Sequence, residues 1–408
     1  MLPEGWDKCQ FGEVTSVASG QVDPKLPPYS TMRHIGPENI ESNTGRLVGT
    51  DKTCAELGLI SGKYEFNENA VIYSKIRPHL NKVCRPTFSG VCSADAYPIW
   101  PHEARLSADY LAQYMLSPIF VKMAVACSMR TGMPKINRED LQRINICFPT
   151  LAEQKEVVRI LGVWDEAIAT AERLLLNSRI QKQTLVWQLF KRRRHGAAVQ
   201  NEWSHVDFDS VFERVTRKNS EKNNNVLTIS GEHGLISQRN YFNKNVASEN
   251  LTGYTLLRKG EFAYNKSYSA GYPMGAIKPL HRYNDGVVSG LYICFRCRDE
   301  AAVDADFFRH YFEAGLLNDE LTGVAQEGAR NHGLLNVGVG DFFKLRLHIP
   351  GVHEQRRIAQ IINMAESNER AIAEQITKLR DEKRALMQQL LTGKRRVRLP
   401  QPVEAEST

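Results

Sequence analysis

The sequence predicts an α+β protein that is a tandem, pseudo-two-fold duplication. Each half is expected to be a mixed α/β domain followed by a long helix, and the two helices are expected to pair as an antiparallel coiled coil. Three observations support this: a gapless internal repeat, β-rich runs that alternate with short amphipathic helices, and two long heptad patterns. The predicted segments are residues 1–150, 151–195, 196–348 and 349–395, with a C-terminal tail at 396–408.

The internal repeat is clearest where each long helix begins. LAEQKEVVRIL (Leu151–Leu161) matches VHEQRRIAQII (Val352–Ile362), 201 positions further along the chain. The same offset holds without a gap over about 40 residues, which chance alone does not explain. The matching pairs are Pro149 and Pro350, Glu153 and Glu354, Gln154 and Gln355, Ile160 and Ile361, Lys182 and Lys383, Leu185 and Leu386, Gln188 and Gln389, and Leu189 and Leu390.

The first part of each half is predicted to contain short strands and short helices. NAVIYSKI (Asn69–Ile76), RINICFP (Arg143–Pro149) and LYICFRC (Leu291–Cys297) are rich in β-branched and aromatic residues and are bounded by turn residues, which indicates strands. ARLSADYLAQYMLS (Ala104–Ser117) and AAVDADFFRHYFEAGLL (Ala301–Leu317) lie at corresponding places and have the spacing of amphipathic helices.

The second part of each half is predicted to be one long helix. Glycine and proline are absent from His353–Thr392, and Gly162 is the single exception in Glu153–Lys191. Apolar residues step alternately by four and three, and eight of ten seam positions are apolar in each helix, which is typical of a coiled coil. The seams are Val157, Leu161, Trp164, Ile168, Ala171, Leu175, Ser178, Lys182, Leu185 and Leu189, and Ile358, Ile362, Ala365, Glu369, Ile372, Ile376, Leu379, Lys383, Leu386 and Leu390.

Two features bear on how these helices pair. The connection HGAAVQNEW (His195–Trp203) is short, so the second helix most simply runs back along the first, which favours an antiparallel pair. Lys182 and Lys383 fall at the same seam position. Buried lysines can set the register of a coiled coil, but we expect instead that the seam opens here and leaves both lysines solvated.

Composition indicates a globular protein without a membrane segment. The chain has 53 basic and 46 acidic residues, a net charge of +7, which permits a polyanionic partner. The basic runs KRRRH (Lys191–His195) and KRRVR (Lys394–Arg398) each follow a long helix, where they either offset the helix dipole or contact phosphate. No signal peptide is expected, and the window Met115–Met129 is too short to span a bilayer. Eight cysteines without framework spacing favour reduced thiols in a cytoplasm.

The repeated Pro-x-x-x-Glu-Gln helix openings, the heptad helices after each domain and YSKIRPHLNKV (Tyr73–Val83) resemble the specificity subunits of type I restriction–modification systems. The resemblance covers essentially the whole chain. It implies two target recognition domains that each read one half of a bipartite, asymmetric DNA sequence, a helical spacer, and docking surfaces for two modification (methyltransferase) subunits. The second domain departs from the pattern, because FAYNKSYSAGYPMGA (Phe262–Ala276) lacks the Arg-Pro of the first, which implies different half-site preferences.

Candidate DNA contacts follow from the resemblance and from local chemistry, because DNA readers combine cations that position phosphates with side chains that reach base edges. The first domain offers Lys75, Arg77, His79, Asn81 and Lys82 on the loop after a strand, and Arg130 and Lys135 on a later loop. The second domain offers Lys266 and Tyr268, and Arg330, Asn331 and His332. Ordinary solvated turns have similar composition. Glu153, Gln154, Glu354 and Gln355 are expected to be structural, with partner docking as the alternative.

No catalytic motif is recognised. The chain lacks the Asn/Asp-Pro-Pro-aromatic tetrapeptide of adenine methyltransferases, and GLISGKY (Gly58–Tyr64) lacks the spacing of a phosphate-binding loop. Cys294 and Cys297 lie three apart in a predicted strand, so they face opposite sides, which disfavours a zinc site. We therefore expect no catalytic residue, cofactor or metal in this chain, with S-adenosylmethionine, ATP and Mg²⁺ bound by partner subunits.

The expected function is recognition of double-stranded DNA within a cytoplasmic type I complex. The expected partners are two modification subunits and restriction (translocase/nuclease) subunits, with no membrane. A specificity subunit of a related methylation-only or fused restriction system is an alternative. So is a coiled-coil scaffold that spaces two protein-binding domains, and the missing motifs disfavour a self-contained nuclease.

Overall fold

The computed structural model describes residues 3–128, 134–192, 203–231, 233–239, 250–327 and 335–399. Two compact units make up the chain, and each is described by itself. Unit 1 comprises Met1–Arg173 and Ile372–Thr408, and unit 2 comprises Leu174–Ala371. Each unit therefore contains part of both long helices.

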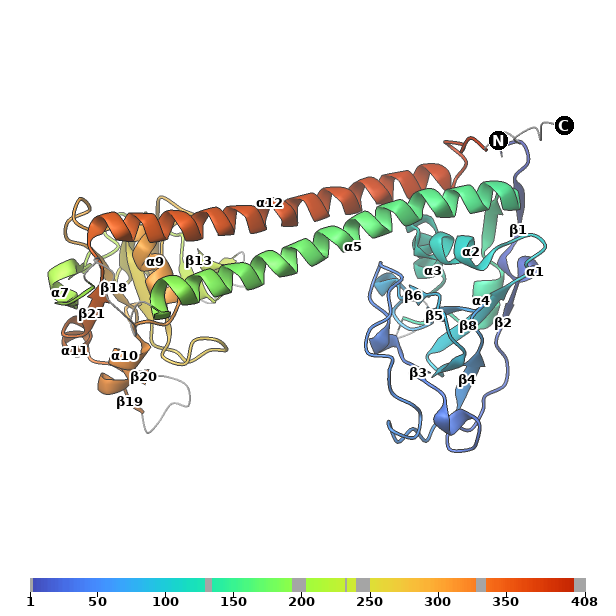
Figure 1. Cartoon of the computed structure of the whole chain (residues 1–408), viewed down its shortest axis with the longest axis horizontal. Coiled ribbons are helices and arrows are strands. Elements are labelled where there is room, and N and C mark those ends of the chain that lie inside the picture. The colour runs from blue at the N-terminus through green and yellow to red at the C-terminus, as the bar shows by residue number, and fades with distance from the viewer. Residues whose placement is uncertain are drawn as a thin grey trace, which may run out of the picture. The chain divides into compact units, whose positions relative to one another are not determined.

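Unit 1 is built on an antiparallel sheet with the strand order β2-β8-β5-β6 (Figure 1). These strands are β2 (Thr15–Val17), β8 (Ala96–Pro101), β5 (Val71–Ser74) and β6 (Val83–Cys84). A second sheet, β3-β7-β4, contains β3 (His34–Ile35), β7 (Gly90–Ser93) and β4 (Lys63–Phe66), with β3 parallel to β7. β1 (Asp7–Gln10) pairs with β9 (Asn145–Phe148), which brings the start of the unit next to the residues that precede the long helix.

The core of unit 1 lies between β5 and four short helices. The helices are α1 (Phe11–Val14), α2 (Ala108–Leu116), α3 (Pro118–Ser128) and α4 (Arg138–Gln142). All four residues of β5 are buried, which explains its nearly continuous apolar sequence. Phe120 on α3 packs against Phe11 and Tyr73, with ring centroids 5.8 and 5.7 Å apart. The predicted strand at Asn69–Ile76 is thus confirmed in its central part.

Unit 2 repeats this plan. Its four-stranded sheet has the order β11-β18-β15-β16, which matches that of unit 1 strand for strand. The strands are β11 (Phe212–Arg214), β18 (Ile293–Cys297), β15 (Phe262–Asn265) and β16 (Ala276–Pro279). The flanking pairs are β10 (Ser204–Asp207) with β21 (Arg346–Ile349), β12 (Leu227–Ser230) with β13 (Gly234–Ser237), β14 (Thr255–Arg258) with β17 (Asp285–Val288), and β19 (Gln326–Glu327) with β20 (Leu335–Asn336). The helices are α7 (Phe208–Val211), α9 (Ala305–Glu313), α10 (Asn318–Val324) and α11 (Val339–Phe343).

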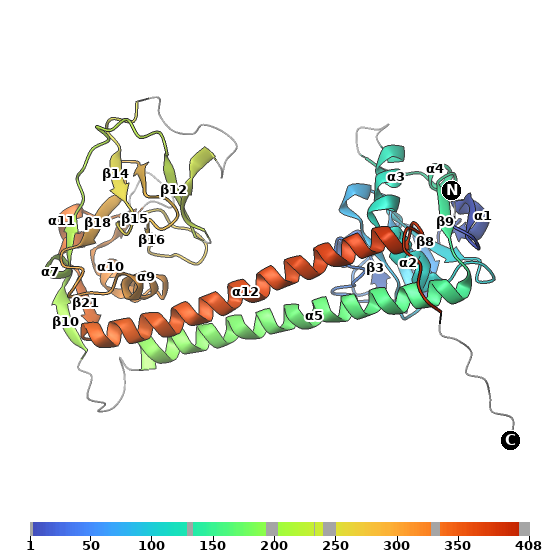
Figure 2. The ribbon, with the colours of Figure 1, turned by 90° about the horizontal axis from the view of Figure 1, so that it is seen from above.

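The predicted long helices are α5 (Leu151–Trp187), which continues into a π-helical turn at Gln188–Arg192, and α12 (Val352–Leu390). They run side by side in both views (Figures 1 and 2). Every predicted seam position is buried or half-buried, so the heptad pattern is confirmed.

In unit 1, Asp165 and Glu172 of α5 bind Lys383 and Arg380 of α12. In unit 2, Ser178 and Lys182 contact Asn368 and Glu369. Residues 165 and 172 of α5 thus contact residues 383 and 380 of α12, whereas residues 178 and 182 contact residues 368 and 369, so the pairing is antiparallel.

The seam lysines are ion-paired. Lys383 is 7% exposed, and its Nζ lies 2.6 Å from Oδ1 of Asp165. Lys182 is half-buried, with its Nζ 2.9 Å from Oε2 of Glu369. The interpretation in which an opened seam leaves both lysines solvated is therefore wrong for Lys383. A buried ammonium needs an acceptor, so each carboxylate favours the register that places it opposite a lysine.

The repeated glutamine explains why the same helix start occurs twice. Gln154 is fully buried, and its Oε1 accepts the backbone N–H of Ser107 at 2.9 Å. Its Nε2 donates to the carbonyl oxygens of Arg105 and Pro149 at 2.7 and 2.9 Å. Ser107 is the N-cap of α2, so one amide joins the start of α5 to the start of α2.

Gln355 makes the equivalent joint in unit 2. Its Oε1 accepts the N–H of Asp304, the N-cap of α9, at 3.0 Å, and its Nε2 donates to Pro350 O at 2.8 Å. The side chains of the adjacent glutamates also accept hydrogen bonds from arginines of the same chain. Glu153 accepts from Arg396 at 2.7 and 3.0 Å, and Glu354 accepts from Arg357. All four residues therefore have the structural role that was expected of them.

Within the described ranges, no single helix is long and apolar enough to cross a membrane. α2 and α3, which are bent by 68° at the break between them, pass that test of length and composition as a pair.

We expect Gln154→Leu to destabilise unit 1 by about 3 kcal/mol, because the change removes three hydrogen bonds to backbone groups, one of them buried and two partly buried. Gln355→Leu should cost unit 2 slightly less, because two such bonds are lost. Denaturant unfolding monitored by circular dichroism measures both. The control is Gln181→Leu, an exposed position on α5, which should change stability by less than about 0.5 kcal/mol. Equal effects at Gln154 and Gln181 would contradict the anchoring role.

Candidate nucleic-acid interface

The first group of predicted contacts lies on the loop between β5 and β6. Arg77 (φ 48°) and Asn81 (φ 47°) both adopt the left-handed conformation, on either side of a 3-10 turn at Pro78–Leu80. The helical conformation is disfavoured before a proline, and left-handed arginine is uncommon. Hydrogen bonds from Arg77 N–H to Pro134 O (2.8 Å) and from Asn81 N–H to Pro78 O (3.0 Å) hold the loop in this shape. Arg77 and His79 are exposed.

A β-bridge brings two predicted contact segments of unit 1 together. Ile76 pairs with Lys135 in antiparallel orientation, and the N–H of Ile136 donates to Lys75 O at 2.9 Å. The exposed side chain of Lys135 therefore belongs to the same local structure as Arg77 and His79. Within the described part of the chain, these three side chains form no hydrogen bond or ion pair with protein. They are available to an external anion.

An aromatic ring supports this loop from the sheet. The Nζ of Lys75 lies 5.1 Å from the ring centroid of Tyr97 on β8, and the guanidinium carbon of Arg138 lies 5.7 Å from the same centroid. Arg138 also donates to the carbonyl oxygen of Ala18. Burial raises the pKa of Tyr97, so the ring stays neutral beside two cations. Arg138 and Tyr97 have no distinguishing pattern in the sequence, because only the folded sheet places them next to Lys75.

Two predicted contact residues of unit 1 are used inside the fold. Asn81 is 3% exposed, and its Nδ2 donates to Leu116 O at 2.9 Å and to Asn43 Oδ1 at 3.2 Å. Its expected DNA contact is corrected here, because a buried amide that binds a helix end is not presented at the surface. The Nζ of Lys82 donates to the carbonyl oxygen of Pro37, and the side chain is half-buried, so Lys82 has a partner within the chain, and its predicted DNA contact stays a prediction.

The corresponding loop of unit 2 follows β15. Lys266 O accepts from Leu335 N–H at 3.0 Å, and its Nζ donates to Val337 O at 3.3 Å. In both units the carbonyl oxygen of a lysine after the strand accepts an N–H from this later segment, although at the repeat offset of 201 Leu335 corresponds to Pro134 and not to Ile136. Tyr268 is 63% exposed. Arg130, Arg330, Asn331 and His332 lie outside the described residues, so their predicted contacts stay predictions.

The basic run after α12 is partly used within unit 1. Arg396 donates to Glu153 and, through Nη1, to Glu4 O at 2.9 Å. Lys394, Arg395 and Arg398 are exposed. Of the first basic run, residues 193–195 lie outside the described ranges. Among the described residues, no group of three or more His, Cys, Asp or Glu side chains has the arrangement of a metal site.

Both units thus have a loop of defined conformation at the same edge of an equivalent sheet. The loop joins β5 to β6 in unit 1 and β15 to β16 in unit 2. In unit 1 the loop carries exposed cations, which suit phosphate oxygens. In unit 2 it carries a half-buried lysine and an exposed tyrosine, a ring with a hydrogen-bonding hydroxyl. This arrangement is suited to binding a polyanion through two related but chemically different surfaces.

Comparisons with known proteins agree with this architecture. A family model described as the type I restriction modification DNA specificity domain matches residues 3–177. The specificity subunit of the type I restriction enzyme EcoDI from Escherichia coli is 40% identical over 158 residues, which cover 39% of this chain and 34% of that protein. The match therefore spans about a third of the length of this relative.

Solved structures share the fold over nearly the whole chain. One comes from a study of complex assembly and conformational transition in a type I restriction–modification system; it has a TM-score of 0.63 at 18% identity and covers 96% of this chain and 98% of its own. The HsdS subunit from Thermoanaerobacter tengcongensis has a TM-score of 0.51 at 17% identity, with coverage of 96% and 98%. The type I S subunit from M. genitalium has a TM-score of 0.52 at 14% identity, with coverage of 95% and 96%. Residues 3–177 therefore match the model of the type I restriction modification DNA specificity domain, and the chain shares the fold of these solved S subunits.

Proposed function

We propose that this chain is the sequence-specific DNA-recognition subunit of a type I restriction–modification complex. The observation that carries the proposal is the duplication. Residues 3–177 match the DNA specificity domain family, and unit 2 repeats the sheet order, the helix positions and the glutamine anchor of unit 1. A chain with two such units contains two sites of the same kind.

Each unit would read one half of a bipartite site. Both candidate loops lie at the same sheet edge, but unit 1 offers Arg77, His79 and Lys135, whereas unit 2 offers Lys266 and Tyr268. Different side chains on equivalent loops favour different base sequences, so the two half-sites would be unrelated and the whole site asymmetric. The paired helices α5 and α12 would set the number of base pairs between the half-sites.

The chemistry would belong to other subunits. We propose that the chain is not an enzyme. It would dock two methyltransferase subunits, joined by restriction subunits that translocate and cut DNA. S-adenosylmethionine, ATP and Mg²⁺ would bind to those partners, and the assembly would act in the cytoplasm. The scaffold alternative predicts the same helices but no preference between DNA sequences.

The test of the proposal is selection from a DNA library. The full chain, assembled with modification subunits, is expected to enrich a motif of two specified half-sites separated by a fixed number of unspecified base pairs. Enriched sequences are read by sequencing, and methylation of the recovered motif is scored with S-adenosylmethionine present. Binding that is indifferent to sequence would favour the scaffold, and enrichment of only one half-site would contradict one unit per half-site.

A second prediction concerns salt. We expect the double variant Arg77→Ala/Lys135→Ala to bind DNA with a weaker salt dependence. The slope of the logarithm of the binding constant against the logarithm of the salt concentration should become shallower by about 2, since each lost phosphate contact removes about 0.9 from that slope. The change in slope reports the phosphate contacts of these two cations, and any loss of discrimination between matched and mismatched sites reports their contacts with base edges. The control is Arg159→Ala with Arg173→Ala, two exposed arginines of α5, which removes the same charge. Equal slope changes in the two double variants would show that net charge, not the loop, is responsible.

A further inference from the structure

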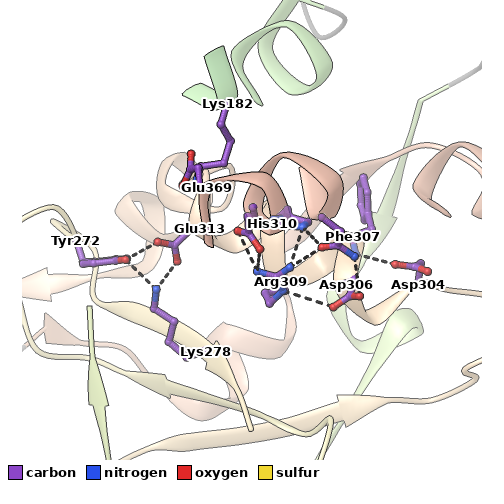
Figure 3. A network of polar contacts seen from close by, with 12 residues as sticks. Lys182, Tyr272, Lys278, Asp304, Asp306, Phe307, Arg309, His310, Glu313 and Glu369 are labelled. Carbon is purple, nitrogen blue, oxygen red and sulfur yellow. Dashed lines mark hydrogen bonds and ion pairs between the residues drawn. The ribbon is translucent and has the colours of Figure 1, made fainter. Parts of the chain in front are cut away.

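The β15–β16 loop of unit 2 is held at one point by a buried lysine. Lys278 on β16 is 8% exposed, and its Nζ donates to Tyr272 Oη at 2.8 Å, to Gly231 O at 3.0 Å and to Glu313 on α9 (Figure 3). An ammonium has three N–H donors, and all three are used. Three segments that are distant in sequence therefore meet at one cation.

Tyr272 completes this cluster. Its hydroxyl lies 2.9 Å from Gly231 O and 2.6 Å from Glu313 Oε1, and its ring centroid lies 4.7 Å from the Nζ of Lys278. Burial, with the nearby charge of Glu313, raises the pKa of Tyr272, so the hydroxyl keeps its proton as a donor. A Cβ on residue 231 would lie 2.8 Å from the Tyr272 ring, so glycine is needed for this contact.

Apart from this cluster, the loop is held by its own backbone hydrogen bonds and, at its start, by the contacts of Lys266 with Leu335 and Val337. It includes Gly271 (φ 83°) and Gly275 (φ 77°), and glycine loses more backbone freedom on ordering than other residues. Within the loop, Tyr272 N–H donates to Ser269 O at 2.9 Å, and Tyr264 Oη donates to Met274 O at 2.9 Å. Tyr268 lies four positions before Tyr272 on the same turn and is 63% exposed.

We propose that Lys278, Tyr272 and Glu313 are positioning residues for specificity: they fix the turn that carries Lys266 and Tyr268, and thereby set which bases unit 2 accepts. This inference rests on the proposed DNA-recognition function. A turn held in its bound shape avoids an ordering cost and admits fewer competing arrangements at the base edges. Lys278 is buried and Tyr272 is half-buried, so these two act from behind the turn, whereas the side chain of Glu313 is 47% exposed and binds Lys278 from α9.

Unit 1 has a different anchor at the equivalent place. There the loop is fixed by the buried amide of Asn81 and by the left-handed residues on either side of Pro78–Leu80. Loosening the Lys278 cluster should therefore alter the reading of one half-site alone.

The experiment uses Tyr272→Phe, which removes one hydroxyl, and Lys278→Met, which keeps an unbranched stem but removes the charge. Each full-length variant, assembled with modification subunits, is tested by library selection and by hydrogen exchange of the loop amides. Discrimination at the unit 2 half-site should fall about tenfold, loop exchange should rise, and discrimination at the unit 1 half-site and the salt slope should stay unchanged. The matched control is Tyr292→Phe, a half-buried tyrosine of the same unit, which should leave all four readouts as in the parent protein.

The possible outcomes separate the inference from the function it rests on. A parent protein that shows no preference for a bipartite DNA site would contradict both the proposed function and the inference about Lys278, Tyr272 and Glu313. A selective parent whose Tyr272→Phe variant has faster loop exchange but unaltered base preference would overturn the inference alone. Equal relaxation at both half-sites, with a lowered melting midpoint, would also overturn it, because that result reports general loss of structure.

Discussion

At its first turn, each long helix is joined to a short helix of its own unit by a buried glutamine amide, and the direction of the long helix depends on that joint. The first residues of α5 and α12 leave backbone N–H groups unpaired, and so do those of α2 and α9. Gln154 and Gln355 satisfy such a group at the N-cap of the short helix while binding the proline carbonyl just before the long one. The direction of each long helix is thus tied to a short helix that packs on the sheet. Because the start of the long helix is fixed to the sheet in this way, a loop on that sheet has a defined orientation relative to the helix start in its own unit.

The two halves keep this joint but have diverged in the polar contacts around it. In unit 1, Gln113 on α2 donates to Asp165 at 3.2 Å. In unit 2 the corresponding stretch of α9 carries Arg309 and His310, and Arg309 binds Glu366 at 3.0 Å. Burial, together with the charge of Arg309, lowers the pKa of His310, so the imidazole ring is neutral beside the Arg309 guanidinium. The same helix-to-helix packing is therefore maintained by an amide and a carboxylate in one unit and by an arginine network in the other.

The exposed loops diverge further than the framework that carries them. The β5–β6 loop depends on two left-handed residues and a buried asparagine, whereas the β15–β16 loop depends on glycines and a buried lysine. Residues of the sheet and of the helix joints are constrained by packing on several sides, but a loop at a sheet edge is constrained mainly where it returns to the sheet. A duplicated frame with independently anchored loops can therefore carry two different surfaces. This property suits a subunit that recognises two unlike half-sites.

The sequence by itself determined the duplication, the two long helices, their antiparallel pairing and the short strands, because these follow from periodicity and from a repeat that is visible without a structure. It also selected Lys75, Arg77, Lys135, Lys266 and Tyr268, since cations and aromatic residues on turns can be recognised by type. The folded chain alone shows that Asn81 is buried, that Lys82 binds the carbonyl oxygen of Pro37, that Lys135 joins the Arg77 loop through a β-bridge, and that Lys278 binds Tyr272 on the loop of Tyr268. Those contacts join residues far apart in sequence. Whether a polar side chain faces solvent or a buried acceptor depends on what the rest of the chain packs against it, and no local pattern contains that information.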